Sequence, residues 1–217
     1  MSKETYDHDY NLIYKSFKTT LSLLQHQGYN IDSNRDISLP ELQSRIETNT
    51  INFLVERDTG EKTYVIYHIN KQLRPGHIQE YSEDIYQFRE ILKETDQLII
   101  ISKDKFNYAN VSGLSDTLES ALIQLYQEFK FYINVFPMSI LQFNVLEHTL
   151  VPKHIKLSQD EITDFKKEFN VLDNSNLPTL SRFDAVAKSI GLMPGEICKI
   201  TRPSKISIDS IYYRLCI

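Results

Sequence analysis

Hydrophobic residues recur at spacings of three and four between about Tyr10 and His26. This period brings them to one face of an amphipathic helix, and Gly28 just beyond it is typical of a helix end. A shorter helix is expected after Ser38, whose hydroxyl stands three residues before the Glu41 carboxylate with a proline between them. Both segments are predicted to bury one face.

Runs of β-branched and aromatic residues predict strands at 51–56, 63–69, 98–101 and 131–136. The first two are joined through Asp58-Thr59-Gly60, a spacing typical of a β-hairpin. The run at 98–101 is continuously hydrophobic, which is typical of a strand that is covered on both faces. Helical patterns separate the later strands, so we expect an α/β domain with a mixed sheet.

Two helices are expected between these later strands. For the first, Ser82 is the predicted N-cap, and the buried face is predicted to carry Ile85, Phe88, Ile91 and Leu92. The second is expected to run from Ser115 to about Phe129. Each would cover the sheet with its hydrophobic side.

Shorter elements and more prolines mark the chain from about residue 145. The elements expected here are a helix capped by Ser158 and Glu161 with Phe165 and Phe169 inward, a short helix between Asp184 and Gly191, and strands at 196–201 and 211–215. We therefore place a domain boundary near residue 144. The prediction is an α/β N-terminal domain at 1–144 and a small α+β C-terminal module at 145–217.

The chain has 217 residues, of which 24% are charged, and it contains 13 Tyr and 11 Phe. This composition is typical of a folded protein. No hydrophobic run approaches the roughly 18 residues of a membrane helix, so no membrane partner is expected. The first nine residues carry acids where a secretory signal is hydrophobic, so we expect an intracellular protein. The lone cysteines, Cys198 and Cys216, are expected to pack as small hydrophobic residues.

The net charge of −5 is unevenly distributed along the chain. Residues 1–144 carry 14 basic and 20 acidic side chains, whereas residues 145–217 carry 10 and 9. Each contact with a DNA phosphate needs a cation, so a domain with a net charge of −6 would not retain DNA alone. Any contact with DNA would have to be held in place by larger partners.

No motif for metal or phosphate binding is present. The six histidines form no HxxxH pair, no cysteine lies near them, and neither a P-loop nor a GxSxG sequence occurs. We therefore expect no metal, no cofactor, no catalytic residue and no small-molecule substrate in this chain.

A metal-dependent nuclease remains an alternative interpretation. Such enzymes hold Mg²⁺ with an acid on one strand and an acid and a lysine that alternate on the next. The nearest fragments are Asp58 with Glu61-Lys62, and Asp104-Lys105. In both, the acid and the lysine are adjacent and would point to opposite faces of a strand.

Four sequence blocks occur in order in the C-terminal module: Leu150-Val151-Pro152-Lys153-His154; Leu177-Pro178 with Asp184-Ala185-Val186-Ala187; Gly191 and Gly195 with Lys199 and Arg202-Pro203-Ser204; and Tyr213-Arg214. This series closely resembles the assembly module of the fifth subunit shared by eukaryotic RNA polymerases I, II and III, and of its smaller archaeal counterpart. Near the N-terminus, residues 12–19, Gln27-Gly28-Tyr29 and Leu39-Pro40 resemble the eukaryotic subunit. The archaeal counterpart lacks this domain, so the two-domain eukaryotic type is the better match.

The resemblance implies a non-catalytic subunit of a DNA-directed RNA polymerase. Its C-terminal module would dock on the largest subunit, in contact with other polymerase subunits, and its N-terminal domain would form part of the jaw beside downstream DNA. The Mg²⁺ site would belong to the two large subunits. A transcription-associated adaptor that uses the same module outside the polymerase core is the other alternative.

The candidate docking residues are those that match the family pattern: Pro152, His154, Pro178, Asp184, Gly191, Gly195, Lys199, Arg202, Ser204, Tyr213 and Arg214. By themselves, many of these residues also fit structural roles as caps, turns and helix boundaries. We expect Lys199, Arg202 and Arg214 to lie on one edge of the module. Lys103 and Lys105 are the candidates for weak contacts with phosphates of downstream DNA.

Two departures from the family pattern bear on docking. Ala185 stands where the family has proline after the capping Asp, and Ile206-Ser207-Ile208 replaces a turn with Thr-Ala-Gly or Thr-Ser-Gly. The final hairpin is therefore expected to turn differently. The 25 Ile and 13 Asn against 4 Ala suggest AT-rich coding DNA. A cellular copy would act in the nucleus, and a viral homologue in cytoplasmic replication sites and virions.

Overall fold

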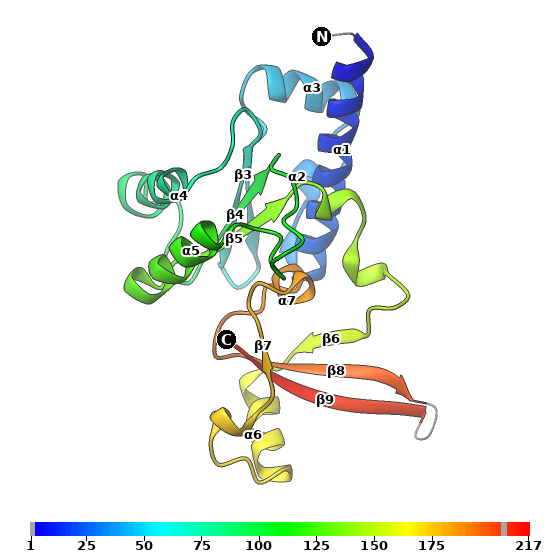
Figure 1. The fold of residues 1–217 in the computed structure, drawn as a ribbon, viewed down its shortest axis with the longest axis vertical. Helices are drawn as coiled ribbons and strands as arrows, with labels where there is room; N and C mark the ends of the chain where they lie inside the picture. The colour runs from blue at the N-terminus through cyan, green and yellow to red at the C-terminus, as the bar shows by residue number, and fades with distance from the viewer. Residues whose placement is uncertain (1–2, 205–207) are drawn as a thin grey trace. The chain divides into compact units, whose positions relative to one another are not determined.

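The computed structural model describes residues 3–204 and 208–217. The chain divides into two compact units, Met1–Asn144 and Val145–Ile217. Each unit has its own β-sheet with helices, as Figure 1 shows. Within the described ranges, no helix combines the length and the hydrophobicity that a membrane span requires.

The N-terminal unit is built on a five-stranded sheet in the order β1-β2-β3-β4-β5. Its strands are β1 (Tyr29–Asn30), β2 (Phe53–Arg57), β3 (Lys62–His68), β4 (Gln97–Ser102) and β5 (Tyr132–Pro137). β2 and β3 form an antiparallel hairpin, while β4 runs parallel to both β3 and β5. The predicted mixed sheet is confirmed, and β4 and β5 are buried along their whole lengths.

Helix α1 (Lys3–His26) covers one face of this sheet. Phe17 is fully buried, with its ring 5.3 Å from the Phe53 ring and 6.4 Å from the Tyr67 ring. The helix is followed by Gly28 at a φ of 88°. A left-handed conformation at this point suits glycine, as the sequence predicts.

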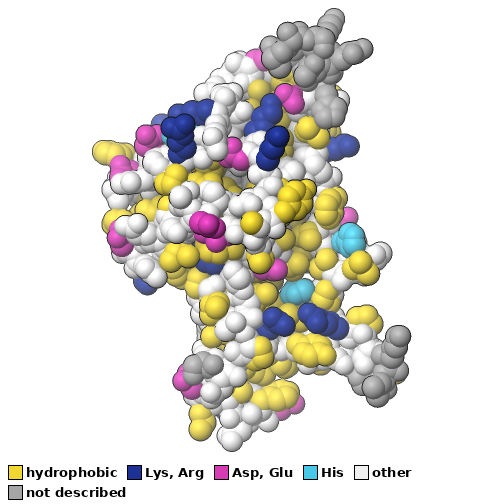
Figure 2. All heavy atoms as spheres, in the orientation of Figure 1, with side chains coloured by type: hydrophobic (Ala, Val, Ile, Leu, Met, Phe, Trp, Pro, Cys, Tyr) yellow, Lys and Arg dark blue, Asp and Glu magenta, His cyan; other side chains and the backbone are white. Residues whose placement is uncertain are grey.

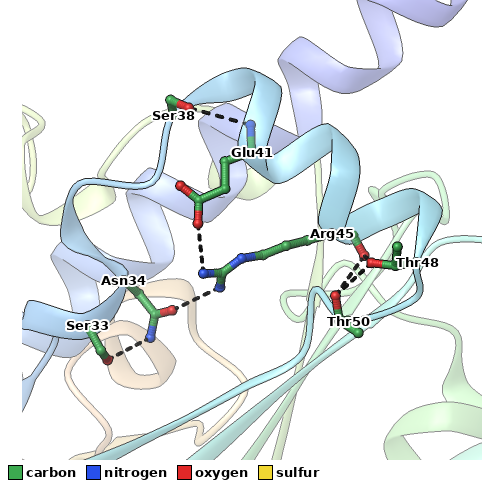
Figure 3. Close-up of polar contacts among 7 residues, drawn as sticks. All are labelled: Ser33, Asn34, Ser38, Glu41, Arg45, Thr48 and Thr50. Carbon is green, nitrogen blue, oxygen red and sulfur yellow. Dashed lines mark hydrogen bonds and ion pairs between the residues drawn. The ribbon is translucent and has the colours of Figure 1, made fainter.

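Helices α2 (Asp32–Arg35) and α3 (Leu39–Glu47) are joined by a short polar network, drawn in Figure 3. The Ser38 hydroxyl accepts a hydrogen bond from the Glu41 amide at 3.4 Å, so Ser38 caps α3 as predicted. The Glu41 carboxylate pairs with Arg45 at 2.9 Å. Arg45 in turn donates to the side-chain oxygen of Asn34 at 3.4 Å, which links the two helices.

Between β3 and β4 the chain forms α4 (Pro75–Ser82), which continues into the π-helix η1 (Glu83–Phe88). The predicted N-cap Ser82 is therefore wrong, because it is the last residue of α4. The prediction that Phe88 is buried is also wrong, since its side chain is 79% exposed. A π-helix has a wider turn than an α-helix, so residues three and four apart no longer share a face.

Helix α5 (Asp116–Phe129) connects β4 to β5 and confirms the helix predicted from Ser115 to about Phe129, with Ser115 as its N-cap residue. Leu118 and Leu122 are its buried residues. α4 and α5 contact each other and lie side by side (Figure 1). Together with α1 on the opposite face, they enclose the N-terminal sheet.

The C-terminal unit has a four-stranded sheet in the order β6-β8-β9-β7. Its elements are β6 (Lys153–Lys156), α6 (Gln159–Glu168), β7 (Thr179–Leu180), α7 (Ala185–Ser189), β8 (Ile197–Ser204) and β9 (Ile208–Cys216), with 3-10 turns at Val145–Glu147 and Asn174–Asn176. A further 3-10 turn, Ile140–Gln142, follows β5 in the N-terminal unit. The capping box predicted at Ser158 and Glu161 is present at the start of α6. The chain therefore has an α+β fold in this unit, as predicted.

Two small hydrophobic cores lie on opposite faces of the C-terminal sheet. Leu157, Phe165 and Ile197 form the core beside α6, and Ala187, Ile190, Leu192, Cys198, Ile200 and Cys216 form the core beside α7. Ile197 and Cys198 are neighbours in β8, so their side chains necessarily point to different faces. Both cysteines are buried, as predicted, and burial raises the pKa of Cys198 to about 11 and that of Cys216 to about 12.

Candidate docking surface

Strands β8 and β9 form a hairpin that is only partly covered by other strands. They pair without interruption from Ile197 opposite Leu215 to Ser204 opposite Ile208. β6 pairs only with residues 198–201 of β8, and β7 only with Leu215 and Cys216 of β9. Within the described ranges, the outer stretch of the hairpin therefore has no strand on either side. Such open edges can pair with another chain.

Three hydrophobic side chains are exposed on the part of β9 that β7 leaves unpaired. Ile208 is 85% exposed, Ile211 52% and Tyr212 48%. Figure 2 shows basic and hydrophobic side chains next to one another over the strands of the C-terminal unit. The candidates chosen from the sequence do not include these three residues. The sequence does contain a feature that could have identified them. Hydrophobic residues occupy both the odd and the even positions of β9, a pattern that predicts apolar side chains on both faces of the strand.

The face that carries Tyr212 also carries two arginines. Cys198 is opposite Arg214 and Arg202 is opposite Ser210, so the alternation of β8 places Arg202 and Arg214 on the same face. The Arg202 guanidinium lies 5.3 Å from the centre of the Tyr212 ring. Arg214 donates from Nη1 to the Thr179 carbonyl at 3.1 Å, so its side chain is held against β7.

Lys199 belongs to the opposite face, where it is paired with Tyr213. The structure therefore does not gather Lys199, Arg202 and Arg214 on one surface, and that prediction is wrong. The reason is geometric, because residues separated by an odd number of positions in a strand alternate between its faces. Two of the three cations remain together on the face of Tyr212.

Tyr213 packs against helix α6. Its ring centre lies 4.1 Å from that of Phe165 and 5.5 Å from that of Phe169. The Tyr213 side chain is only partly exposed, so its main contacts are internal to the unit. The predicted inward position of Phe165 is confirmed, whereas Phe169 is mostly exposed at the end of the helix.

Pro152 and His154 shape the start of β6. The Nδ1 atom of His154 lies 2.6 Å from the Pro152 carbonyl oxygen. A carbonyl only accepts, so Nδ1 carries the proton in this contact. His154 is also paired with Ile200 in the sheet and is half-buried. These contacts fix the direction of the chain between Pro152 and β6.

Asp184 and Gly191 define the two ends of α7. The Asp184 carboxylate accepts hydrogen bonds from the amides of Val186 at 2.9 Å and Ala187 at 3.2 Å. Gly191 is buried at a φ of 66°, directly after the helix. Both predicted roles, a cap and a stop, are confirmed.

Pro178 and Gly195 hold the last strand in place. The Pro178 carbonyl accepts from the Leu215 amide at 2.9 Å, and the Gly195 amide donates to the Cys216 carbonyl at 2.9 Å. Gly195 has a φ of 92°, and a Cβ atom there would meet nothing within 4 Å. Glycine is thus needed at this position for its backbone conformation and not for space.

Lys103 and Lys105 lie in the N-terminal unit, on the loop that follows β4. Lys103 forms an ion pair with Asp9 of α1, with 2.7 Å between Nζ and Oδ2. Asp104 accepts from the Leu73 amide at 3.1 Å, which holds the loop, and Lys105 is exposed. The pairing of Lys103 with an acid 94 residues away is not visible in the sequence.

The acidic fragments of the nuclease interpretation serve other contacts. Glu61 pairs with Arg57, and the Lys62 amide donates to the Asp96 carboxylate at 2.9 Å. Among the residues that the structure describes, no group of three or more His, Cys, Asp or Glu side chains is placed to hold a metal ion. No observation therefore favours that interpretation.

Comparison with known proteins bears on the unit that carries this hairpin. Residues 143–216 match the family model described as RNA polymerase Rpb5, C-terminal domain. The chain is also 39% identical over 77 residues to DNA-directed RNA polymerase subunit Rpo5 of Archaeoglobus fulgidus, which covers 36% of this chain and all of that protein. The chain belongs to the family of the fifth RNA polymerase subunit.

Two further members of the fifth-subunit family resemble the chain over nearly its whole length. It is 27% identical over 209 residues to DNA-directed RNA polymerases I, II, and III subunit rpabc1 of Dictyostelium discoideum, covering 96% of this chain and 99% of that protein. It is 24% identical over 213 residues to DNA-directed RNA polymerases IV and V subunit 5B of Arabidopsis thaliana, covering 93% and 88%. The similarity to fifth subunits thus includes the N-terminal unit.

The two departures from the fifth-subunit pattern lie at α7 and at the tip of the hairpin. Ala185 is the first residue of α7, and the hydrogen bonds of the Asp184 cap are retained in front of it. Ile206 and Ser207 lie outside the described residues. Ile208, which follows them, has a φ of 63°, a conformation that is strained for a β-branched residue.

Proposed function

We propose that this chain is a non-catalytic subunit of a DNA-directed RNA polymerase and docks on the largest subunit through its C-terminal unit. The names of its relatives support the class of complex. The observation that carries the docking proposal is the open edge of β9 between residues 208 and 214, with exposed Ile208, Ile211 and Tyr212. Exposed apolar side chains beside unpaired strands are typical of protein interfaces.

Docking would combine two kinds of contact on this hairpin. The partner's backbone would hydrogen-bond along the open edge of β9, and its hydrophobic side chains would cover Ile211 and Tyr212. Arg202 and Arg214, on the face of Tyr212, would pair with acidic groups of the partner, because a planar guanidinium recognises carboxylates with two parallel hydrogen bonds. The remaining family residues would act by holding the hairpin rigid.

The N-terminal unit would serve as the jaw domain beside downstream DNA. Its net charge of −6 opposes retention of DNA by this unit alone, so the polymerase would hold it there. Lys105 would contact phosphates without reading sequence, whereas the charge of Lys103 is already balanced by Asp9. Replacing Lys105 with alanine should therefore weaken retention of downstream DNA by the assembled enzyme more than replacing Lys103. Equal retention by wild type and both variants would contradict this contact.

The docking proposal is tested by comparing exposed positions within the C-terminal unit. Ile211→Asp and Tyr212→Asp should each reduce recovery of the largest polymerase subunit with a tagged chain. Leu172→Asp is the matched control, because Leu172 is also highly exposed but lies outside the hairpin. Loss of recovery with Leu172→Asp alone would contradict docking through β8–β9. We propose that the subunit acts where its polymerase transcribes, in the nucleus for a cellular copy and in cytoplasmic replication sites and virions for a viral one.

A further inference from the structure

A groove lies in the N-terminal unit between the α4–η1 helix and α5, and none of the candidate docking or DNA-contacting residues is part of its lining. It has a volume of about 250 Å³. Its lining includes Gln79 and Glu83 on one wall, Gln124 and Glu128 on the other, and Leu125 and Phe131. In Figure 2, hydrophobic and acidic side chains lie next to one another over α4 and α5.

Two residues of the groove lining, Phe129 and Phe131, belong to a stack of aromatic rings. Phe131 stacks on Tyr86 with 4.0 Å between ring centres, and Phe129 stacks on Phe131 at 5.4 Å. The Tyr86 hydroxyl donates to the Asp96 carbonyl at 3.2 Å, which fixes the innermost ring. Phe129 is 43% exposed. The groove thus offers a fixed aromatic surface that stays partly open to water.

The π-helix η1 forms part of one wall and ends in Phe88, whose side chain is 79% exposed. Glu90, two residues later, has a left-handed φ of 50°. Both features cost free energy, since a π-turn is less stable than an α-turn and a left-handed residue other than glycine is strained. With this backbone conformation, the Phe88 side chain points outward and does not pack in the core.

The rim of the groove is negatively charged on both sides. Gln79 donates to Glu83 at 3.0 Å, and Gln124 donates to Glu128 at 3.0 Å, so each carboxylate is held by its own helix. No ion pair involves Glu83 or Glu128 in the described part of the chain. Two such carboxylates repel DNA phosphates and attract cations.

We propose that this groove binds a basic amphipathic segment of a partner protein. Hydrophobic side chains of the segment would rest on Phe129 and Phe131, and its Lys or Arg side chains would pair with Glu83 and Glu128. The charge of the rim selects this occupant, because an acidic segment would be repelled on both sides. Exposed aromatic residues at the centre of a contact commonly supply most of its binding free energy.

The probes are two fluorescent peptides with the same helical pattern of leucines, one with lysine and the other with glutamate at its polar positions. Binding to the full chain is measured by fluorescence anisotropy at about 150 mM salt, where nonspecific attraction between distant charges is screened. The lysine peptide should bind and the glutamate peptide should not. Absence of binding by the lysine peptide would overturn the proposal.

Because the chain is acidic overall, a variant with matched charge is required. Glu83→Lys combined with Glu128→Lys should weaken binding of the lysine peptide at least about tenfold, and Phe129→Ser should weaken it about tenfold. Glu47→Lys combined with Glu56→Lys makes the same change of net charge at two exposed sites outside the groove lining and should leave most binding intact. Equal losses of affinity for the lysine peptide in the two double variants would refute specific binding in the groove. Tyr212→Asp should not alter peptide binding, so this test is independent of docking through the hairpin.

Discussion

The Arg202 guanidinium lies 5.3 Å from the centre of the Tyr212 ring, diagonally across the β8–β9 pair. Both side chains are exposed; Arg202 lies beyond the part of β8 that pairs with β6, and Tyr212 lies on the part of β9 that β7 leaves unpaired. A guanidinium on an aromatic face adds roughly 0.5–1 kcal/mol at such a site. The contact therefore does little for the fold and holds two side chains ready for a partner.

The first prediction concerns this pair. Arg202→Ala and Tyr212→Ala should each lower the free energy of unfolding by about 1 kcal/mol or less, because neither side chain is buried. Recovery of the largest polymerase subunit should fall much more strongly. Urea unfolding and affinity purification of the same variants separate the two effects. A large loss of stability with normal recovery would show that the pair belongs to the core.

The second prediction concerns the cap of α7. Asp184→Ala should lower the free energy of unfolding by about 1 kcal/mol, because two amides of the first turn lose their acceptor. Asp184→Asn should retain most of this stability, since its side-chain oxygen can accept the same bonds. Urea unfolding monitored by circular dichroism measures both. Identical curves for the alanine and asparagine variants would contradict the cap.

The third prediction is a dependence of stability on pH. The Ser158 amide, the Ser158 hydroxyl and nearby Lys199 lower the pKa of the Glu161 carboxyl in the folded protein, with the amide contributing most. Its contribution to stability is therefore present above the pKa of the unfolded chain and is lost as the pH falls through the lower folded pKa.

Thermal unfolding between neutral and acidic pH tests this dependence. Glu161→Gln should lower the melting temperature at neutral pH, and its curve should approach that of wild type as the pH falls. Glu168→Gln removes the same charge in the last turn of α6 and should not lower the melting temperature at neutral pH, because a negative charge there is not favoured by the helix dipole. A difference between Glu161→Gln and wild type that is constant at all pH values would rule out the carboxylate as its source.

The fourth prediction compares two glycines with equal space around them. A Cβ atom would meet nothing within 4 Å at Gly195 or at Gly76, but only Gly195 has a positive φ. Gly195→Ala should therefore cost about 1–2 kcal/mol from backbone strain alone, whereas Gly76→Ala, in the first turn of α4, should be neutral or slightly stabilising. Gly195→Asn should cost less than alanine. Equal effects at both glycines would show that space, and not conformation, decides.

Much of the fold follows from local patterns in the sequence. The spacing around Phe17, the cap at Ser38 and the continuous run of β4 each identify their element, because one face or both faces of it are buried. The short strands β1, β6 and β7 are not predicted, since two to four residues are too few to show an alternation of hydrophobic and polar positions. The π-helix is missed for a different reason: its wider turn is not encoded in the i, i+3, i+4 pattern that places Phe88 inside.

The same distinction between local and tertiary features applies to the candidate docking residues. Local roles such as the Asp184 cap and the Gly191 stop are readable from a few adjacent residues. Relations between distant residues are not: the pair of Lys103 with Asp9 and the separation of Lys199 from Arg202 depend on tertiary contacts and on register. The exposed β9 side chains are missed because burial by a helix cannot be judged from strand alternation alone.

Membership of a polymerase is decided by the composition of the complex that the full chain forms in its own cell or infected host. A tagged chain is purified at near-physiological salt, and the two largest co-eluting polypeptides are identified and quantified by mass spectrometry. We expect the two large subunits of a DNA-directed RNA polymerase in equal amounts with the tagged chain. A chain recovered alone, or with transcription proteins but without those two subunits, would contradict this membership.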